Sequence, residues 1–253
     1  MNKLRIISRL DVKNENLIKG IHLEGLRRIG NPNQFALKYY NQGIDEILIS
    51  DVVASLYDRD SILKVINYIA QNVFVPICVG GGIRSVNDAK LLLRNGADKI
   101  FLNTAAIKNP DLITKLSKIY GKSTVVVSIE AKRKVNKWFA FTKNGREPTG
   151  LDAIKWAKKA EILGAGEILI TSIDQEGTQK GFDIKLLKEI MREVNIPVVV
   201  SGGMGKLEDL KNLVKLKPSG IALASVLHYE KLSIKDIKKY IVKKLKVKVR
   251  SEK

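Results

Sequence analysis

The sequence predicts an α/β fold, a (β/α)8 TIM barrel built from two homologous half-barrels, and three observations support this prediction. Short β-rich segments alternate with helical patterns eight times along 253 residues, the usual length of one such barrel. Residues 75–105 and 196–226 are two versions of one segment, and the second begins 121 positions after the first. The same offset relates residues 43–52 to residues 164–173. We therefore expect a single barrel domain over residues 1–253.

The strands and helices are expected in strict alternation, which is typical of a parallel sheet covered by helices. The internal doubling favours closure of this sheet into a barrel over an open sheet. The expected strands are Leu4–Val12, Glu46–Val52, Ile77–Val79, Lys99–Leu102, Thr124–Ile129, Glu167–Thr171, Val198–Ser201 and Gly220–Leu223. The expected helices lie near 32–41, 59–71, 85–95, 110–120, 151–163, 183–194, 206–216 and 233–244.

Three helix starts carry local signals. Asn31-Pro32 and Asn109-Pro110 each place a capping residue before a proline at the first helical position. Ser85 precedes an apolar-periodic segment and is followed three residues later by Asp88, as in a capping box. These signals concern structure alone.

Two connections are longer than simple turns. Residues 14–31 follow the first strand and contain three glycines and several basic residues, so they are expected to form a lid over a charged substrate. The alternative is a disordered surface excursion. Residues 132–149 are expected to form a small hairpin, with Trp138 and Phe139 near its apolar side.

Composition narrows the possible environment and partners. One cysteine, Cys78, allows no disulfide within the chain and indicates a reducing compartment, and no segment is long and apolar enough to suggest a membrane span. We expect a cytoplasmic protein. The formal charge of +19 indicates either a surface for anions or a solvated, lysine-rich surface. Nucleic-acid binding is not favoured, because no RNA-binding signature or aromatic platform accompanies the basic residues.

Histidine and cysteine give no indication of a metal site. His22 lies in the expected lid and His228 follows the eighth strand, and neither has a partner at metal-ligand spacing. Both are expected to be ordinary surface or loop residues. No dinucleotide or nucleoside-triphosphate motif occurs either, so no metal and no cofactor are expected.

Glycine pairs follow two equivalent strands, and each half has a small polar strand end beside its pair. In barrels of this type, loops at the carboxyl ends of strands seven and eight often hold a phosphate. Glycine lets backbone N–H groups approach the anion, and the doubling repeats the arrangement across the mouth. The sequence therefore predicts a ligand with a phosphate at each end, bound by Gly81, Gly82, Asn103, Thr104, Ser201, Gly202, Gly203, Ala224 and Ser225.

Two acidic residues end the first and fifth strands. Asp11 in LDVK and Glu130 in IEAK occupy corresponding places in the two halves, so they are expected to face each other across the mouth. Opposed carboxylates can divide general acid and general base catalysis. The alternative is a structural pair that accepts backbone hydrogen bonds or pairs with Lys13 and Lys132. Further substrate contacts are expected from the same rim, at Asp51, Glu176 and Gly177.

Four charged residues begin strands at the opposite end of the barrel. Period-two alternation directs all of them inward, so they are expected to form a ring of alternating charge. The ring is either a structural salt-bridge network or a gate for a small molecule, and its members are Arg5, Glu46, Lys99 and Glu167.

The whole chain resembles the cyclase subunit of imidazole glycerol phosphate synthase, the HisF family of histidine biosynthesis. The resemblance runs from end to end through stretches such as LDVK (10–13), KGIHLEGL (19–26), VGGGIRS (79–85), GADKIFLNTAA (96–106), GAGEILITSID (164–174) and SGGMGKLED (201–209).

The resemblance implies a heterodimer with a glutaminase subunit of the HisH type, which supplies ammonia at the barrel bottom. It also implies that the ring acts as an ammonia gate. The implied substrate is a bis-phosphate, the phosphoribulosyl-formimino aminoimidazole carboxamide ribotide. The implied products are imidazole glycerol phosphate and aminoimidazole carboxamide ribotide. The catalytic positions of the family match Asp11 and Glu130, and Lys19 matches a substrate-contacting lysine of its mobile loop.

Four departures from the family pattern concern the reaction path. Glu130 and Glu176 stand where the family has aspartate, and Phe101, above the ring, replaces a small polar residue. Arg9 replaces a small residue and points into the barrel, where it either pairs with Glu130 or binds an anion. These changes leave open a HisF-like paralogue that delivers ammonia to another phosphorylated or nucleotide-linked acceptor, such as an amidino-sugar precursor. A catalytically idle barrel, which binds ligand or only activates its partner, is a further alternative.

Overall fold

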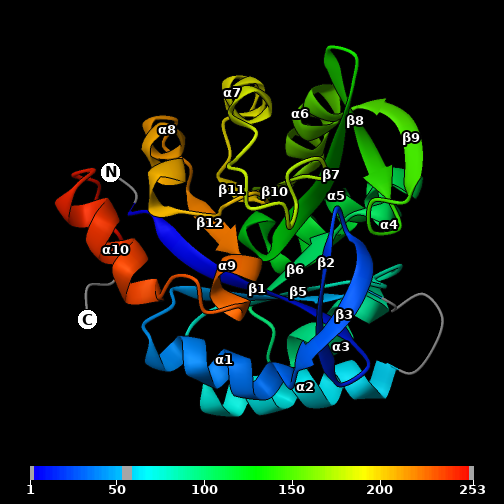
Figure 1. The fold of residues 1–253 in the computed structure, drawn as a ribbon. Coiled ribbons are helices and arrows are strands. Elements are labelled where there is room, and N and C mark those ends of the chain that lie inside the picture. Colours follow the sequence, from blue (N-terminus) through cyan, green and yellow to red (C-terminus); the bar gives the residue numbers. More distant parts are fainter. Residues whose placement is uncertain (1–2, 53–58, 251–253) are drawn as a thin grey trace.

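A computed structural model describes residues 3–52 and 59–250, with the side chains of residues 59 and 60 left out. Eight parallel strands form a closed barrel in the order β10-β11-β12-β1-β4-β5-β6-β7, and β7 pairs again with β10. Helices surround this barrel on its outside (Figure 1). The prediction of a (β/α)8 barrel is therefore confirmed. The barrel strands are β1 (Arg5–Lys13), β4 (Glu46–Asp51), β5 (Ile77–Gly80), β6 (Lys99–Leu102), β7 (Val125–Lys134), β10 (Glu167–Ser172), β11 (Val198–Ser201) and β12 (Gly220–Leu223).

The outer helices lie where the apolar periodicity places them. They are α1 (Pro32–Asn41), α2 (Arg59–Asn72), α3 (Val86–Arg94), α5 (Asp111–Tyr120), α6 (Ala153–Leu163), α7 (Ile184–Glu193), α8 (Leu210–Lys215), preceded by the 3-10 turn η2 (Leu207–Asp209), and α10 (Ile234–Lys243). The structure adds a second 3-10 turn, η1 (Lys122–Thr124), and two short helices, α4 (Thr104–Lys108) and α9 (Ser225–His228). Among the described residues, no helix is both long and apolar enough to span a bilayer.

Two of the three predicted helix starts are confirmed. The Asn31 side chain accepts hydrogen bonds from the backbone N–H groups of Asn33 and Gln34, and Ser85 and Asp88 form a capping box. The Asn109-Pro110 prediction is wrong. Helix α5 starts one residue after Pro110, and no side chain caps it, because Asn109 closes the preceding short helix α4 instead.

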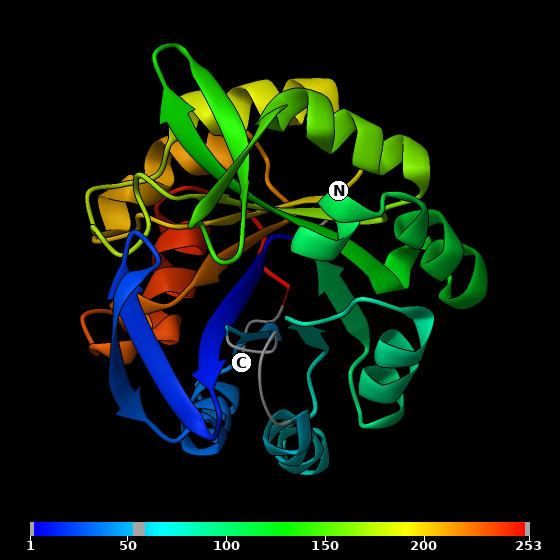
Figure 2. The ribbon, with the colours of Figure 1, turned by 90° about the vertical axis from the view of Figure 1, so that its right-hand side faces the viewer.

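Each half of the barrel carries a β-hairpin above its first strand. In the first half, β2 (Asn16–Ile21) and β3 (Glu24–Gly30) pair antiparallel with each other, and β2 pairs with β1. In the second half, β8 (Lys137–Thr142) and β9 (Glu147–Asp152) extend β7 in the same way. Both hairpins project from the same end of the barrel (Figure 2). The expected hairpin near 132–149 is confirmed, and residues 14–31 form an ordered hairpin instead of a disordered excursion.

The register between strands gives the correspondence of the two halves independently of the sequence. Asp11 on β1 lies beside Ser50 on β4, and Glu130 on β7 lies beside Thr171 on β10. Ser50 and Thr171 correspond in the sequence repeat. Asp11 and Glu130 are therefore equivalent positions of the two half-barrels, and it follows that Arg9 is equivalent to Ser128.

The barrel interior is layered. Each of the eight strands contributes one buried apolar residue to a middle layer: Ile7, Leu48, Cys78, Phe101, Val126, Leu169, Val199 and Ala222. The larger hydrophobic core lies between the outer face of the barrel and the helices, and it includes buried residues such as Ile47, Ile100 and Leu186. Because period-two alternation places successive inward residues in successive layers, polar side chains lie above and below the apolar layer.

Candidate active site

Asp11 lies buried at the mouth of the barrel and is held by cations. Its Oδ1 accepts a hydrogen bond of 2.9 Å from Nε of Arg9, and its Oδ2 lies 4.0 Å from Nζ of Lys19. Burial opposes ionisation of this carboxyl group, but the charges of Arg9 and Lys19 and the Arg9 hydrogen bond outweigh it and lower the pKa of Asp11. Asp11 is therefore a carboxylate at neutral pH.

Of the two roles expected for Arg9, a hydrogen-bonded pair with Glu130 does not form. Its guanidinium bonds to Asp11, and Nη1 also donates to Oγ1 of Thr171 at 3.0 Å and to Oγ of Ser201 at 3.5 Å. Asp11 lies on the same strand, two residues from Arg9, so it shares the inward face and is within reach of Nε. The charge of Glu130 acts on Arg9 only at longer range.

The side chains near Arg9 differ between the two sides of the barrel. In the first half, Phe101 occupies the space above Gly80, so that a Cβ atom on Gly80 would lie 2.4 Å from its ring. In the repeat, the equivalent positions hold Ala222 and Ser201. The small Ala222 leaves room on this side of the barrel, and Ser201 supplies a hydroxyl acceptor that Gly80 lacks.

Glu130 lies in a different environment, although its position is equivalent to that of Asp11. Its Oε2 accepts hydrogen bonds from Nδ2 of Asn103 at 2.9 Å and from the backbone N–H of Gly145 at 2.7 Å. Burial dominates and raises the pKa of Glu130 to about 7, although the charge of Arg9 acts in the opposite direction. The two carboxyl groups thus differ in protonation near neutral pH.

The glycine turn after β11 adopts a backbone that requires glycine. Gly202 and Gly203 have φ angles of 94° and 111°, and a Cβ atom on Gly203 would lie 2.0 Å from the carbonyl oxygen of Gly181. A pocket of 700 Å³ at the mouth is lined by Lys19, Arg27, Gly177, Ser225 and Lys231, among others. Of the predicted phosphate positions of the second half, Ser225 therefore lines a large pocket with basic residues.

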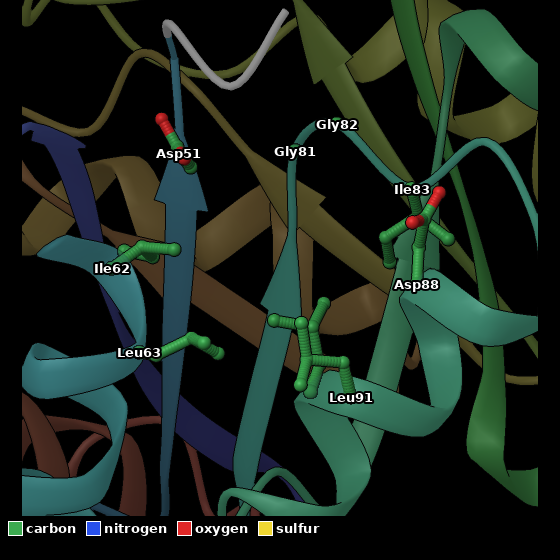
Figure 3. A pocket seen from close by; sticks show the side chains of 9 residues that line it. Asp51, Ile62, Leu63, Gly81, Gly82, Ile83, Asp88 and Leu91 are labelled. Atoms are coloured by element: carbon green, nitrogen blue, oxygen red, sulfur yellow. The ribbon is translucent and has the colours of Figure 1, made fainter. Parts of the chain in front are cut away.

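The equivalent turn after β5 also has two glycines with positive φ, but its surroundings differ. Gly81 and Gly82 have φ angles of 104° and 66°, and a Cβ atom on Gly81 would lie 2.1 Å from the carbonyl oxygen of Asp51. Figure 3 shows this turn between the end of β4 and α3, with apolar side chains of α2 and α3 below it. The cavity there measures only 20 Å³. Residues 53–58, next to Asp51 in the chain, lie outside the described part.

The small polar strand ends also correspond between the halves. Asn103 and Ala224 follow β6 and β12 with nearly the same backbone angles, φ −125° and ψ −86° in one and φ −131° and ψ −88° in the other. Thr104 and Ser225 then begin the short helices α4 and α9. Oγ1 of Thr104 accepts a hydrogen bond of 3.1 Å from the backbone N–H of Lys143. The two halves thus share one backbone arrangement at these predicted phosphate positions.

The first hairpin lies against the barrel mouth. Lys19 on β2 forms a buried ion pair with Glu176 in the loop after β10. In the same contact, the backbone N–H of His22 donates to the carbonyl of Glu176 at 2.8 Å, and Nδ1 of His22 lies 2.8 Å from the carbonyl oxygen of Ile173. The structure therefore places Lys19 and Glu176 together, with Asp11 beside them.

The four charged residues at the other end form the expected ring. Arg5 bonds to Glu46 at 2.6 Å and also to Glu167, and Lys99 lies 3.3 Å from Glu46 and 3.1 Å from Glu167. Each cation contacts both anions. Both carboxylates are buried, and the ring closes the interior below the apolar layer.

The prediction for His228 is wrong, because this residue is buried instead of lying on the surface. Its Nδ1 lies 2.7 Å from the hydroxyl of Tyr39, and the two rings stack with centroids 5.9 Å apart. Burial, reinforced by the charge of Lys19, lowers the pKa of His228 to about 4, so the ring is neutral at physiological pH. The sequence offered one sign of this contact: the apolar periodicity of α1 places Tyr39, the partner of His228, in the core.

Sequence reasoning also missed three contacts at the mouth: that of Arg9 with Thr171, that of Gly145 with Glu130, and that of Arg9 with Asp11. Thr171 was recognisable as an inward residue at the end of a strand. Gly145 was not, because its contact with Glu130 depends on how the second hairpin folds back over the mouth.

Comparisons with known proteins agree with this architecture. The sequence profile of the family described as "Histidine biosynthesis protein" matches residues 5–233. "Imidazole glycerol phosphate synthase subunit HisF" of Legionella pneumophila is 59% identical over 210 residues, covering 83% of this chain and 99% of that protein. Proteins of the same name from Dehalococcoides mccartyi strain BAV1 and Pyrococcus furiosus are 45% and 43% identical, over 96% and 94% of this chain and 96% and 95% of their own lengths. The chain belongs to the histidine biosynthesis protein family.

Proposed function

We propose that this protein is the cyclase subunit of imidazole glycerol phosphate synthase, a carbon–nitrogen lyase acting with a HisH-type glutaminase. In this reaction, ammonia converts the phosphoribulosyl-formimino aminoimidazole carboxamide ribotide to imidazole glycerol phosphate and aminoimidazole carboxamide ribotide. The observation that carries the proposal is the equivalent placement of Asp11 and Glu130 at the mouth of the barrel. The similarity to HisF proteins over nearly the whole chain supports it.

The two carboxyl groups suit a reaction in which ammonia becomes part of a ring. Forming a carbon–nitrogen bond from ammonia requires one group that removes protons from nitrogen and another that gives a proton to a departing group. Asp11, ionised and held by Arg9, serves as the proton acceptor in this proposal. Glu130, with a pKa of about 7, keeps a proton available near neutral pH and serves as the donor.

The glycine turns suit a substrate with two phosphates. Ser225 lines the pocket of 700 Å³, and Lys19, Arg27 and Lys231 outnumber Glu24 among its charged residues and give its wall a positive charge. Asn103 and Thr104, with Gly81 and Gly82, form the equivalent site of the other half. In this proposal, the two turns hold the ends of the substrate while its centre lies over Asp11 and Glu130.

The charged ring suits delivery of ammonia from a partner at the bottom of the barrel. Arg5, Glu46, Lys99 and Glu167 close the interior on the side away from the carboxylates. Ammonia released there would pass the ring and the apolar layer before it reached the mouth. The partner in this proposal is the glutaminase subunit, bound as a heterodimer.

The paralogue alternative rests on residues that differ from the HisF pattern. In the structure, each of these residues is bound or packed by other residues of the chain. Arg9 bonds to Asp11, Glu176 pairs with Lys19, and Phe101 fills the space above Gly80. None of these contacts requires a different acceptor, and the similarity to HisF proteins favours the histidine pathway.

Genetic complementation tests the proposal. We expect the wild-type gene to restore growth without histidine in a strain that lacks its own cyclase subunit, provided that a compatible glutaminase subunit is expressed with it. The matched control is the Asp11→Asn gene, which should yield soluble protein but no growth. Failure of the wild-type protein to support growth, or to convert the bis-phosphate with added ammonium in vitro, would contradict the proposal.

A further inference from the structure

Arg9 lies buried inside the barrel near its mouth, only 3% exposed. Its guanidinium reaches Asp11 on β1, Thr171 on β10 and Ser201 on β11. A planar guanidinium bound on several edges has a fixed orientation, which a flexible ammonium group would not have. The orientation of the Asp11 carboxylate is therefore tied to β10 and β11, which lie beyond β12 in the barrel.

The equivalent position in the second half carries no charge. Ser128 stands there, buried, and the neighbouring Glu130 bonds to a neutral amide and a backbone N–H instead. The half-barrel scaffold is the same in both cases, so the difference between the two carboxyl groups comes from the side chains around them. Arg9 is the closest cation to Asp11, at 2.9 Å, whereas Lys19 lies 4.0 Å away.

Arg9 also connects Asp11 to the second glycine turn. Ser201, one of its acceptors, is the last residue of β11 and directly precedes Gly202. Nη1 of Arg9 donates hydrogen bonds to both Ser201 and Thr171. A shift of the turn therefore moves the guanidinium, and the guanidinium in turn moves the Asp11 carboxylate. The other titratable groups that act on this cluster come from four further elements: Lys19 of β2, Glu130 of β7, Glu176 of the loop after β10 and His228 of α9.

We propose that Arg9 is a positioning residue of the synthase reaction, which fixes the Asp11 carboxylate as the proton acceptor and couples its orientation to the second phosphate turn. This inference rests on the proposed function and adds a positioning residue to it. Arg9 acts through Asp11 and is not itself required to touch the substrate.

Three variants separate positioning from charge and from packing. Arg9→Met removes the positive charge and all three hydrogen bonds but keeps a long apolar side chain. Arg9→Lys keeps the positive charge but lacks the planar guanidinium with its several N–H donors. Thr171→Val removes one anchor of Nη1 and leaves the Asp11 pair intact. Each purified protein is assayed with the bis-phosphate substrate and added ammonium across the pH range. In parallel, the Asp11 carboxyl carbon is titrated by NMR in 13C-labelled protein, and its signal is assigned by comparison with Asp11→Asn.

The expected results differ between the variants. Arg9→Met should lower kcat about 100-fold, the cost of a misplacement of about 1 Å. Because Arg9 lowers the pKa of both Asp11 and Glu130, its removal should also move the pH profile of kcat/KM toward higher pH. Arg9→Lys should leave the profile near that of the wild type but still lower kcat. Thr171→Val should lose about fivefold in kcat, the equivalent of one hydrogen bond.

Several outcomes would overturn the inference. One is an Arg9→Met protein whose pH profile and Asp11 titration match the wild type, which would reduce Arg9 to a packing residue. If Arg9→Met does not fold, wild-type kcat in both Arg9→Lys and Thr171→Val would have the same meaning. A wild-type protein without turnover would instead contradict the proposed function, and the NMR titration would then decide separately whether Arg9 controls Asp11.

Discussion

Asp11 and Glu130 stand at equivalent positions of two half-barrels, one beside Ser50 and the other beside Thr171. Asp11 accepts a hydrogen bond from a charged donor, whereas the donors to Glu130 are neutral. Asp11 is paired with a guanidinium, and Glu130 accepts from an amide and a backbone N–H. The pKa of the first is lowered and that of the second is raised to about 7, because burial of Glu130 is not offset by a hydrogen-bonded cation. A duplicated scaffold thus carries two carboxyl groups suited to different roles.

Replacement of Asp11 by asparagine is expected to abolish ammonium-dependent turnover. The amide cannot accept a proton at neutral pH, and the loss of general base catalysis alone lowers the rate by about 100- to 10,000-fold. The measurement is steady-state turnover of the bis-phosphate with added ammonium, alongside a thermal unfolding curve that confirms the fold. Turnover close to that of the wild type would remove Asp11 from the mechanism.

Replacement of Lys99 by alanine is expected to impair glutamine-dependent turnover more than turnover with added ammonium. Lys99 bridges Glu46 and Glu167 in the ring, so its loss opens the bottom of the barrel and leaves two carboxylates with Arg5 alone. The assay compares the two nitrogen sources in the complex with the glutaminase. Arg192→Ala, which removes an exposed ion pair with Glu189 on α7, is the matched control and should change neither activity. Equal losses with both nitrogen sources would make the ring a structural feature.

Glu130→Gln is expected to change how stability depends on pH. The pKa of Glu130 rises from 4.5 to about 7 on folding, so the protonated form is favoured in the folded protein. The stability that this group contributes is fully present below pH 4.5 and is lost as the pH rises through 7, by about 3 kcal/mol in total. Urea unfolding of both proteins between pH 4.5 and 8 isolates this contribution, since all other groups are common to both. Parallel curves would show that Glu130 has an ordinary pKa.

Gly203→Ala is expected to weaken binding of inorganic phosphate, because the added methyl group would lie 2.0 Å from the carbonyl oxygen of Gly181 and displace the turn. Gly43→Ala is the matched control. Gly43 also has a positive φ, of 85°, but the added methyl group would meet no atom within 4 Å, so only the backbone strain of about 1 kcal/mol is shared. Phosphate affinity is measured by calorimetry. Equal affinities in both variants would place phosphate elsewhere.

The fold was predictable from the sequence because local signals and the repeat agree. Strands β6, β11 and β12 begin and end where they were expected, since each lies between turn residues and is almost entirely apolar. The short helices α4 and α9 were not expected, because a single turn such as Ser225–His228 is too brief for periodicity to reveal it.

The candidate site was predictable in position but not in its contacts. Alternation along the strands placed Asp11, Glu130 and the four ring residues on inward faces. Which donor meets which carboxylate depends on side-chain conformation: Arg9 points into the barrel between two carboxyl groups, and its guanidinium bonds to Asp11 and not to Glu130. The burial of His228 depends in the same way on its stacking with Tyr39, a contact between residues 189 positions apart.

The ring at the bottom of the barrel contains two cationic and two anionic side chains. Arg5 and Lys99 each form ion pairs with both Glu46 and Glu167. The ring is therefore electrically neutral. A metal ion or an ammonium ion that entered it would add an uncompensated charge between partly buried side chains, which is costly. An uncharged molecule would add none. If the ring acts as the proposed ammonia gate, its neutrality would therefore favour passage of uncharged ammonia over ammonium by electrostatics alone.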